Sequence, residues 1–145
     1  MAQVELLLSP LPVHVRTARL VGVAAARRAG LDGDLVDELR LALGEACSRA
    51  VGLHARYAPD VPVRVVLTDD PTGMTVTVAD VGPSAQSEGP SLDVGSFDEQ
   101  DGDVDPQVAL AVLTGLVDDV EVGPGADGTQ GTTVTMRWPL PTRLP

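Results

Sequence analysis

Two charged residues in the stretch EACSRAV, Glu45 and Arg49, have types and spacing suited to chemistry. If the stretch is helical, both lie on one face, and a glutamate four residues before an arginine can form an ion pair worth about 0.2–0.5 kcal/mol. Arg49 has hydrogen-bond donors only and a permanent positive charge, so it cannot hold a metal cation.

Two glycine-containing strings stand where extended segments end or begin. Asp80-Val81-Gly82 follows a run of β-type residues, and Gly131-Thr132 precedes another. An Asp-x-Gly turn is an ordinary way to end a strand, and threonine is an ordinary first residue of one. Residue types alone therefore leave a purely structural role open for both strings.

A long helix is expected to position Glu45 and Arg49. Apolar residues recur at steps of three and four over residues 35–53, and Asp32 or Asp34 can cap the helix at its start. Glu45 and Arg49 fall on the opposite rim, away from the expected core. The apolar stripe consists of Leu35, Leu39, Ala42, Leu43, Ala46, Ala50 and Leu53.

The remaining elements alternate along the chain in the order β-α-α-β-β-loop-α-β-β. This order predicts an α+β fold, a two-layer sandwich in which a mostly antiparallel mixed sheet carries about three helices on one face. Residues 1–145 are expected to form one domain, with 141–145 as a loose tail. The other expected elements are strands over 4–9, 63–68 and 74–81, a helix over 13–29, a helix from Pro106, and two final strands in DDVEVG and TTVTMRWPL.

Residues 82–105 differ from the rest of the chain in composition. They are rich in Gly, Pro, Ser and acidic residues, contain no basic residue and show no strand or helix period. We expect a lid-like acidic loop, because such a composition resists burial and like charges repel. Its carboxylates are Glu88, Asp93, Asp98, Glu99, Asp101, Asp103 and Asp105.

The overall composition excludes several classes of function. A net charge of −11 argues against binding nucleic acid through its phosphates, whereas a basic protein would be attracted. The longest apolar stretches, LVGVAAA and ALAVLTGLV, are shorter than the roughly 20 residues that span a membrane. The start of the chain does not resemble a secretory leader, and the single cysteine, Cys47, suits a buried position in a reducing compartment. A soluble, cytoplasmic protein is therefore expected.

Four strings, LALGEAC, VADVGP, LVDDVEV and GTTVTMRW, resemble in order the sequence blocks of the GHKL (histidine-kinase-like) ATPases. The closest branch is that of the anti-sigma factor serine kinases of bacterial partner-switching systems. The likeness covers nearly the whole chain, from HVRTARL to the last strand. It implies the fold expected above and a site for ATP and magnesium.

On the helix, the resemblance implies that Glu45 takes the position of the general base. Arg49 stands where the family has the asparagine that holds magnesium, an ion that prefers oxygen ligands, so the metal site is expected to be lost. Arg49 would then pair with Glu45 or meet a nucleotide phosphate directly. Leu53 replaces the family's histidine, and His54 and His14 are expected to be exposed and without a role.

On the side of the site that would bind adenine, this sequence keeps most of the residues that the family has. Asp80 matches the aspartate that accepts a hydrogen bond from the adenine amino group, and Gly82 matches the first glycine of that motif. Ser84 replaces the second glycine. Thr132 matches the threonine that helps to hold the adenine.

On the phosphate side, the glycines that open the helix after the lid are absent. Gln107 and Ala109 take their places, and Pro106 removes a backbone N–H donor. The cradle that glycines form for phosphates at a helix N-terminus is therefore expected to be missing.

These losses predict a degenerate site and a regulatory protein that acts by binding. The hypothesis is an anti-sigma factor-like pseudokinase that binds a sigma factor, a STAS-domain anti-anti-sigma factor, or both. A homodimer is compatible with this hypothesis. Nucleic acid and membranes are not expected partners. No cofactor is expected: weak binding of ATP or ADP is compatible with a vestigial site of Glu45, Arg49, Asp80, Gly82 and Thr132, and magnesium is not. The alternative is an active kinase that uses ATP and Mg²⁺ to phosphorylate a serine of a STAS-domain partner.

Overall fold

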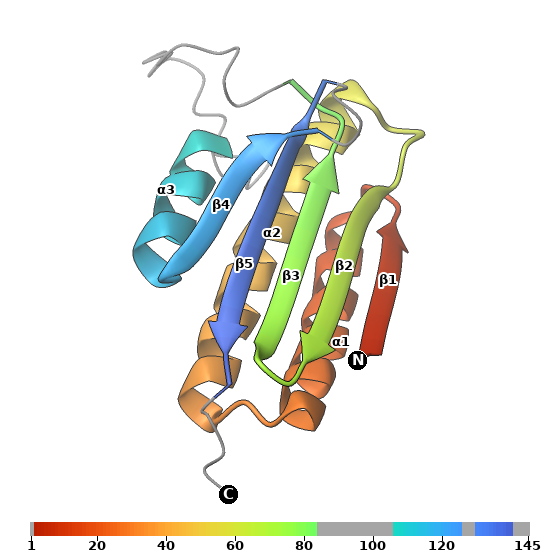
Figure 1. Ribbon diagram of the computed structural model, residues 1–145. Helices are drawn as coiled ribbons and strands as arrows, with labels where there is room; N and C mark the ends of the chain where they lie inside the picture. The colour runs from red at the N-terminus through yellow and green to blue at the C-terminus, as the bar shows by residue number, and fades with distance from the viewer. Residues whose placement is uncertain (1, 84–105, 126–129, 141–145) are drawn as a thin grey trace, which may run out of the picture.

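A computed structural model describes residues 2–83, 106–125 and 130–140, which form an antiparallel sheet with helices on one face (Figure 1). In this part of the chain, five strands pair in the order β1-β2-β3-β5-β4, and every pairing is antiparallel. The elements are β1 (Ala2–Leu8), α1 (Pro12–Ala29), α2 (Gly33–Tyr57), β2 (Val63–Asp70), β3 (Gly73–Asp80), α3 (Pro106–Leu116), β4 (Asp119–Pro124) and β5 (Thr132–Pro139).

Local sequence signals set the ends of the two long helices. Pro12 is at the start of α1, where its missing N–H costs nothing, and Gly30 ends α1 with a left-handed φ of 96°. The Asp32 side chain caps α2 by accepting a hydrogen bond from the Leu35 N–H at 3.0 Å. α1 and α2 are therefore adjacent antiparallel helices joined by a connection of three residues.

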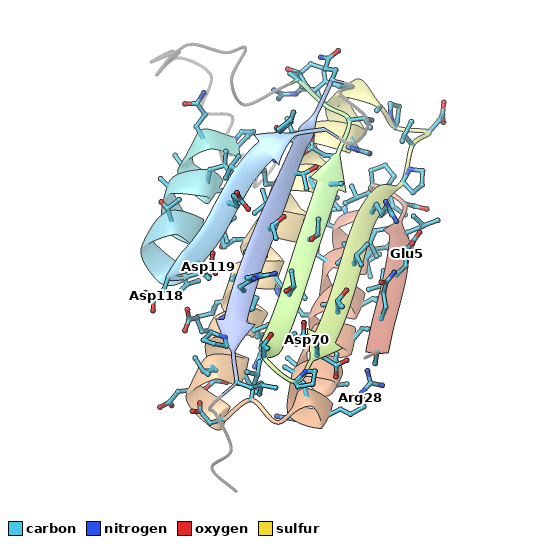
Figure 2. The ribbon with its side chains drawn as sticks, viewed as in Figure 1. Glu5, Arg28, Asp70, Asp118 and Asp119 are labelled. Carbon is cyan, nitrogen blue, oxygen red and sulfur yellow. The ribbon has the colours of Figure 1, made fainter. Side chains whose placement is uncertain are left out.

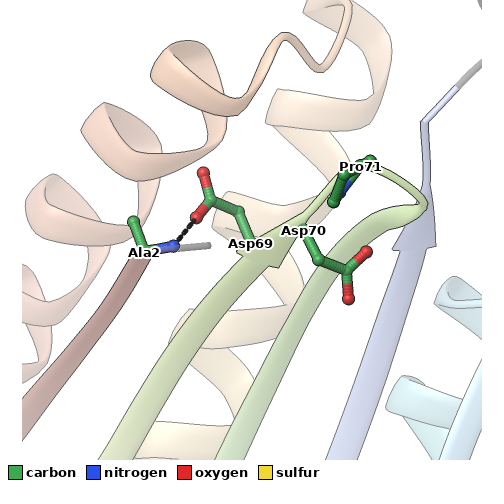
Figure 3. Close-up of a pocket in the computed structure, with 4 residues that line it drawn as sticks. All are labelled: Ala2, Asp69, Asp70 and Pro71. Carbon is green, nitrogen blue, oxygen red and sulfur yellow. Dashed lines mark hydrogen bonds between the residues drawn. The ribbon is translucent and has the colours of Figure 1, made fainter.

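The turn between β2 and β3 is closed by the Asp70 carboxylate. Its Oδ1 accepts hydrogen bonds from the Thr72 N–H at 2.7 Å, from the Gly73 N–H at 3.1 Å and from the Thr72 hydroxyl. These donors, the hydroxyl first, lower the pKa of Asp70. A shallow hollow lies beside this turn, where the Ala2 N–H donates to Asp69 (Figure 3). The hollow is at the far end of β3 from Asp80.

The core fills the space between the sheet and the helices. Strand residues alternate between buried and partly exposed, so one face of the sheet packs on α1 and α2. Gly22 of α1 faces the Leu43 side chain of α2 so closely that a Cβ would collide with it, which allows the two helices to pack tightly. The buried apolar strand residues are Leu8, Val63, Val65, Leu67, Met74, Val76, Val78, Val134, Met136 and Trp138.

The expected α+β two-layer fold and its element order are confirmed. Residues 84–105 and 141–145, on which most of the lid-like loop and the loose tail were predicted, lie outside the described residues. Among the described helices, none is long and apolar enough to cross a membrane.

Cys47 is fully buried in α2, as the sequence predicted, and this gives a testable chemical property. Burial raises the pKa of its thiol to about 12, and the nearby Arg19 offsets this only in part. We therefore expect Cys47 in the folded protein to react with iodoacetamide at about pH 8 far more slowly than in denaturant, because the thiolate is the reactive form. Rapid labelling of the native protein would contradict the burial.

The same raised pKa predicts a pH dependence of stability. The neutral thiol contributes stability fully below the unfolded-state pKa, and this contribution is lost as pH rises towards the folded-state pKa of about 12. The free energy of unfolding should therefore fall more steeply above about pH 9 in the natural protein than in a Cys47→Ala control, as measured by urea denaturation.

Candidate functional site

A buried ion pair joins α2 to the end of β3. The Arg49 Nη1 lies 2.8 Å from the Asp80 Oδ2, and their side chains are only 2% and 1% exposed. At this distance and burial, the charges interact in a medium that screens them much less than water does. Each charge therefore depends on the other for its place in the interior.

The Asp80 carboxylate is engaged on both oxygens. Its Oδ1 accepts a hydrogen bond from the Gly82 N–H at 3.0 Å, which closes a tight turn directly after β3. A side chain at Gly82 would press on Leu53 of α2, with its Cβ 3.1 Å from the Leu53 Cβ. The Asp80-Val81-Gly82 string is thus both a strand-ending turn and a contact surface for α2.

Arg49 leaves one donor unused. Its Nε is buried and has no hydrogen-bond partner, although its Nη1 is bonded to Asp80. Leaving such a donor unsatisfied has a cost, commonly about 1–3 kcal/mol. Within the described residues, the guanidinium binds Asp80 through Nη1 and does not form a bidentate pair with it.

His54 of α2 holds the residue between Asp80 and Gly82. It is completely buried, its Nδ1–H donates to the Val61 carbonyl at 2.7 Å, and its Nε2 accepts from the Val81 N–H at 2.9 Å. The two bonds require a neutral ring with its proton on Nδ1. The expectation that His54 is exposed and without a role is wrong.

The first residues of β5 complete this end of the sheet. Thr132 is buried and lies opposite Asp80 in the β3–β5 register. Gly131 has a φ of 132°, and a Cβ there would collide with the Asp80 carbonyl oxygen. Only glycine allows so close an approach of the two backbones. Asp80, Gly82 and Thr132, predicted from the sequence to share one site, are therefore brought together.

Glu45 is on the same helix as Arg49 but does not pair with it. Arg49 is buried and bonded to Asp80, so the expectation of a helix-surface pair between Glu45 and Arg49 is wrong. Glu45 is partly exposed and makes no ion pair within the described residues. The prediction that Arg49 lies on the rim of α2, away from the core, is wrong as well, because Arg49 is buried.

α3 begins at the positions where the family resemblance implies phosphate-binding glycines. Pro106 is its first residue, Gln107 is exposed, and Ala109 is buried. Proline lacks an N–H, so this helix start offers one donor fewer to an anion. Within residues 2–83, 106–125 and 130–140, no three His, Cys, Asp or Glu side chains are grouped as a metal site.

Within the described residues, two side chains at positions that the family resemblance assigns to ATP and magnesium are bonded to each other. The carboxylate that would accept from the adenine amino group already binds a cation and a backbone N–H. The helix position that would supply an oxygen to magnesium carries a guanidinium that is turned towards Asp80. A nucleotide would have to compete with a buried ion pair, and we derive no catalytic step through it.

Residues 8–138 match the histidine kinase-like ATPase domain family, and the chain belongs to that family. It is also similar to the crystal structure of the RsbU and RsbW domains of Rv1364c from Mycobacterium tuberculosis, with a TM-score of 0.64 and 18% sequence identity. That similarity covers 94% of this chain but 31% of the other, and it shows a shared fold. No match was found among curated proteins.

The role of His54 could have been found from the sequence. His54 follows Ala46 and Ala50 at steps of four, so it continues the apolar stripe of α2 instead of leaving it. A polar side chain on a core-facing stripe must be hydrogen-bonded. That signal predicts burial with partners, although it does not say which partners.

The ion pair gives a prediction about stability. Arg49→Met keeps most of the apolar stem but leaves the Asp80 carboxylate buried without its cation, which should cost about 3–5 kcal/mol of unfolding free energy in urea. The double variant Arg49→Met/Asp80→Asn should lose much less than the sum of the single variants, because it leaves no unpaired charge.

An exposed ion pair of the same chain serves as the matched control. Arg64 and Glu5 lie 3.2 Å apart with side chains 52% and 42% exposed, so Arg64→Met should cost at most about 1 kcal/mol. Equal costs for the buried and the exposed pair would show that Arg49 and Asp80 do not depend on each other.

His54 gives a prediction about one backbone amide. His54→Leu removes the acceptor of the Val81 N–H, so the Val81 amide should exchange its hydrogen much faster with solvent in NMR measurements. The Gly82 amide is bonded to Asp80 and should stay protected, which makes it an internal control. Unchanged exchange at Val81 would refute the assigned bond.

Proposed function

We propose that this chain is a regulatory protein-binding module of a bacterial partner-switching system, an anti-sigma factor-like pseudokinase that binds a sigma factor, a STAS-domain anti-anti-sigma factor, or both. The single observation that carries the proposal is the buried bond between Arg49 and Asp80. One side chain of this bond stands at the position of the metal ligand, and the other stands at the position of the base-binding carboxylate.

The bond between Arg49 and Asp80 opposes recognition of an adenine base. Binding of adenine needs an acceptor that is free to receive the amino group, and a site built for such a bond discriminates strongly. In this chain the acceptor is already neutralised by Arg49 and fixed by the Gly82 N–H. Releasing it would leave a guanidinium in the interior without a partner, which is costly.

The residues missing from the phosphate side of the site also argue against phosphoryl transfer. Phosphoryl transfer depends on neutralising the charge of the phosphates, commonly through a metal ion and backbone donors. Arg49 supplies no oxygen ligand, and α3 begins with Pro106 and Gln107 instead of glycine. Removing one such electrostatic element typically slows an enzyme about 10²–10³-fold, and two kinds are missing here.

The similarity of fold supports a role in partner switching. The chain belongs to the histidine kinase-like ATPase domain family, and 94% of it superposes on a chain described by its RsbU and RsbW domains. A fold does not define an activity, and a site without its ligands can still present a binding surface. We infer that this chain retains the surface and has lost the chemistry.

An ATP- and Mg²⁺-dependent serine kinase is the alternative, and Glu45 is the observation in its favour. Glu45 stands at the position of the general base, is partly exposed, and has no ion pair within the described residues. A carboxylate in this state is available to accept a proton from a hydroxyl group.

Nucleotide titration by calorimetry, with and without Mg²⁺, tests the proposal. The natural protein should bind ATP no more tightly than about 1 mM, with little effect of magnesium. Arg49→Asn restores an oxygen ligand and releases Asp80, so it should gain weak binding that depends on magnesium. Arg64→Asn, a change in an exposed ion pair, should gain none.

Incubation with radiolabelled ATP, Mg²⁺ and a STAS-domain protein separates the two candidate functions. The proposal expects no transfer of phosphate from the natural chain, while the two proteins still associate in size-exclusion chromatography. Stoichiometric phosphorylation of a serine on the STAS-domain protein would overturn the pseudokinase and establish the kinase.

A further inference from the structure

α1 also has a regular pattern of exposed residues on the side away from the core. Its buried residues lie on one side, and its exposed residues other than Pro12 and Arg19 fall within about one third of the helix circumference at 100° per residue. Two large apolar side chains lie on this exposed face: Val13 is 64% and Leu20 is 65% exposed. The face consists of Val13, Arg16, Thr17, Leu20, Ala24, Arg27 and Arg28.

The spacing of the uncharged residues on this face is that of a helix-docking seam. Val13, Thr17, Leu20 and Ala24 follow one another at steps of four, three and four, which is the repeat of helices that pack along each other. Thr17, between Val13 and Leu20, and Ala24, one turn beyond Leu20, are small enough to receive a partner's larger side chains. Nothing in the described chain covers this seam, since all four residues are exposed.

Arginines flank the seam. Arg16 lies on one side of it, Arg28 lies on the other, and Arg27 extends it towards the C-terminal end of the helix. None of the three makes an ion pair within the described residues. Flanking charges on a docking helix select a partner helix of opposite charge.

The charge of α1 is opposite to that of the whole protein. Four of the ten arginines lie on α1, which has no acidic residue, whereas the chain has 21 acidic residues and a net charge of −11. In Figure 2, Arg28 lies at the end of α1 in the helical layer, while Glu5, Asp70, Asp118 and Asp119 lie along the sheet and its connections. The arginine face is therefore a local positive region on an acidic molecule.

Leu41 of the neighbouring helix, α2, provides a comparison for the exposed Leu20 of α1. Leu41 of α2 is 60% exposed, but its neighbours at helical spacing are Asp37, Glu38 and Glu45. Acidic residues around a lone leucine form a solvated helix face and would repel an acidic partner. Leu20 of α1 and Leu41 of α2 are thus similarly exposed, but the charged residues around them are of opposite sign.

We propose that this arginine-flanked face of α1 is a docking surface for an acidic amphipathic helix of a partner protein. Apolar side chains of the partner would pack on Val13 and Leu20, and its carboxylates would meet Arg16, Arg27 and Arg28. The inference rests on the proposed function in one respect, namely that the chain acts by binding a protein. It adds where the partner binds and which chemistry the partner presents.

Fluorescence anisotropy with a designed peptide tests this surface. The labelled probe is a helix of about four turns with leucine at the seam spacing and glutamate on both flanks. We expect saturable binding that weakens at least about tenfold when NaCl is raised from about 0.05 to 0.3 M. A scrambled peptide, and one with lysine in place of glutamate, should not bind.

Matched substitutions locate the binding. Leu20→Glu and Arg16→Glu should each weaken peptide binding at least about tenfold, because they place a negative charge on the seam and on its flank. Leu41→Glu and Arg40→Glu make the same changes on α2 and should leave it unaltered. Circular dichroism of all four variants verifies the fold, which exposed positions should preserve.

Several outcomes would overturn the proposal. These are failure of the acidic peptide to bind, equal weakening by the α1 and α2 variants, or preferential binding of single-stranded DNA or anionic vesicles through the same arginines. Nucleotide titration of the same protein reports on the proposed function separately. Tight ATP binding beside normal peptide binding would therefore overturn the pseudokinase and leave the docking surface in place.

Discussion

The buried bond between Arg49 and Asp80 is the interaction on which this end of the molecule depends. Two charges have been taken out of water, and neither can be removed alone without a large loss of stability. Because Arg49 is on α2 and Asp80 ends β3, the bond fixes the long helix against the central strands. The placement of His54, Val81 and Gly82 follows from that contact.

Three consecutive residues at the end of β3, Asp80 to Gly82, are held by one small hydrogen-bonded network. Arg49 binds Asp80, His54 binds Val81, and Asp80 itself binds Gly82, while Gly131 of the neighbouring strand packs against the Asp80 backbone. Within the described residues, these polar groups bond mainly to one another, although the buried Arg49 Nε has no partner. The partner-binding role that we propose needs no motion of this network, and the α1 face is on a different element.

The sequence predicted the fold well because the fold rests on local patterns. Apolar steps of three and four, the Asp70 turn and the glycine after α1 set the elements. The partner of Arg49 was missed because Asp80 is 31 residues away, and local spacing favoured Glu45. The burial of His54 follows from its step of four from Ala50, whereas its partner Val81 is 27 residues away and cannot be predicted from local spacing.

Because Asp80 is bonded to Arg49, the requirements of folding are enough to explain its presence in the sequence. In this chain, substitution of Asp80 would be eliminated through misfolding, whether or not a nucleotide ever binds. Selection for folding alone can therefore retain this aspartate of the ATP-binding motif. A motif search that counts Asp80 as a sign of nucleotide binding would be reading the requirements of folding.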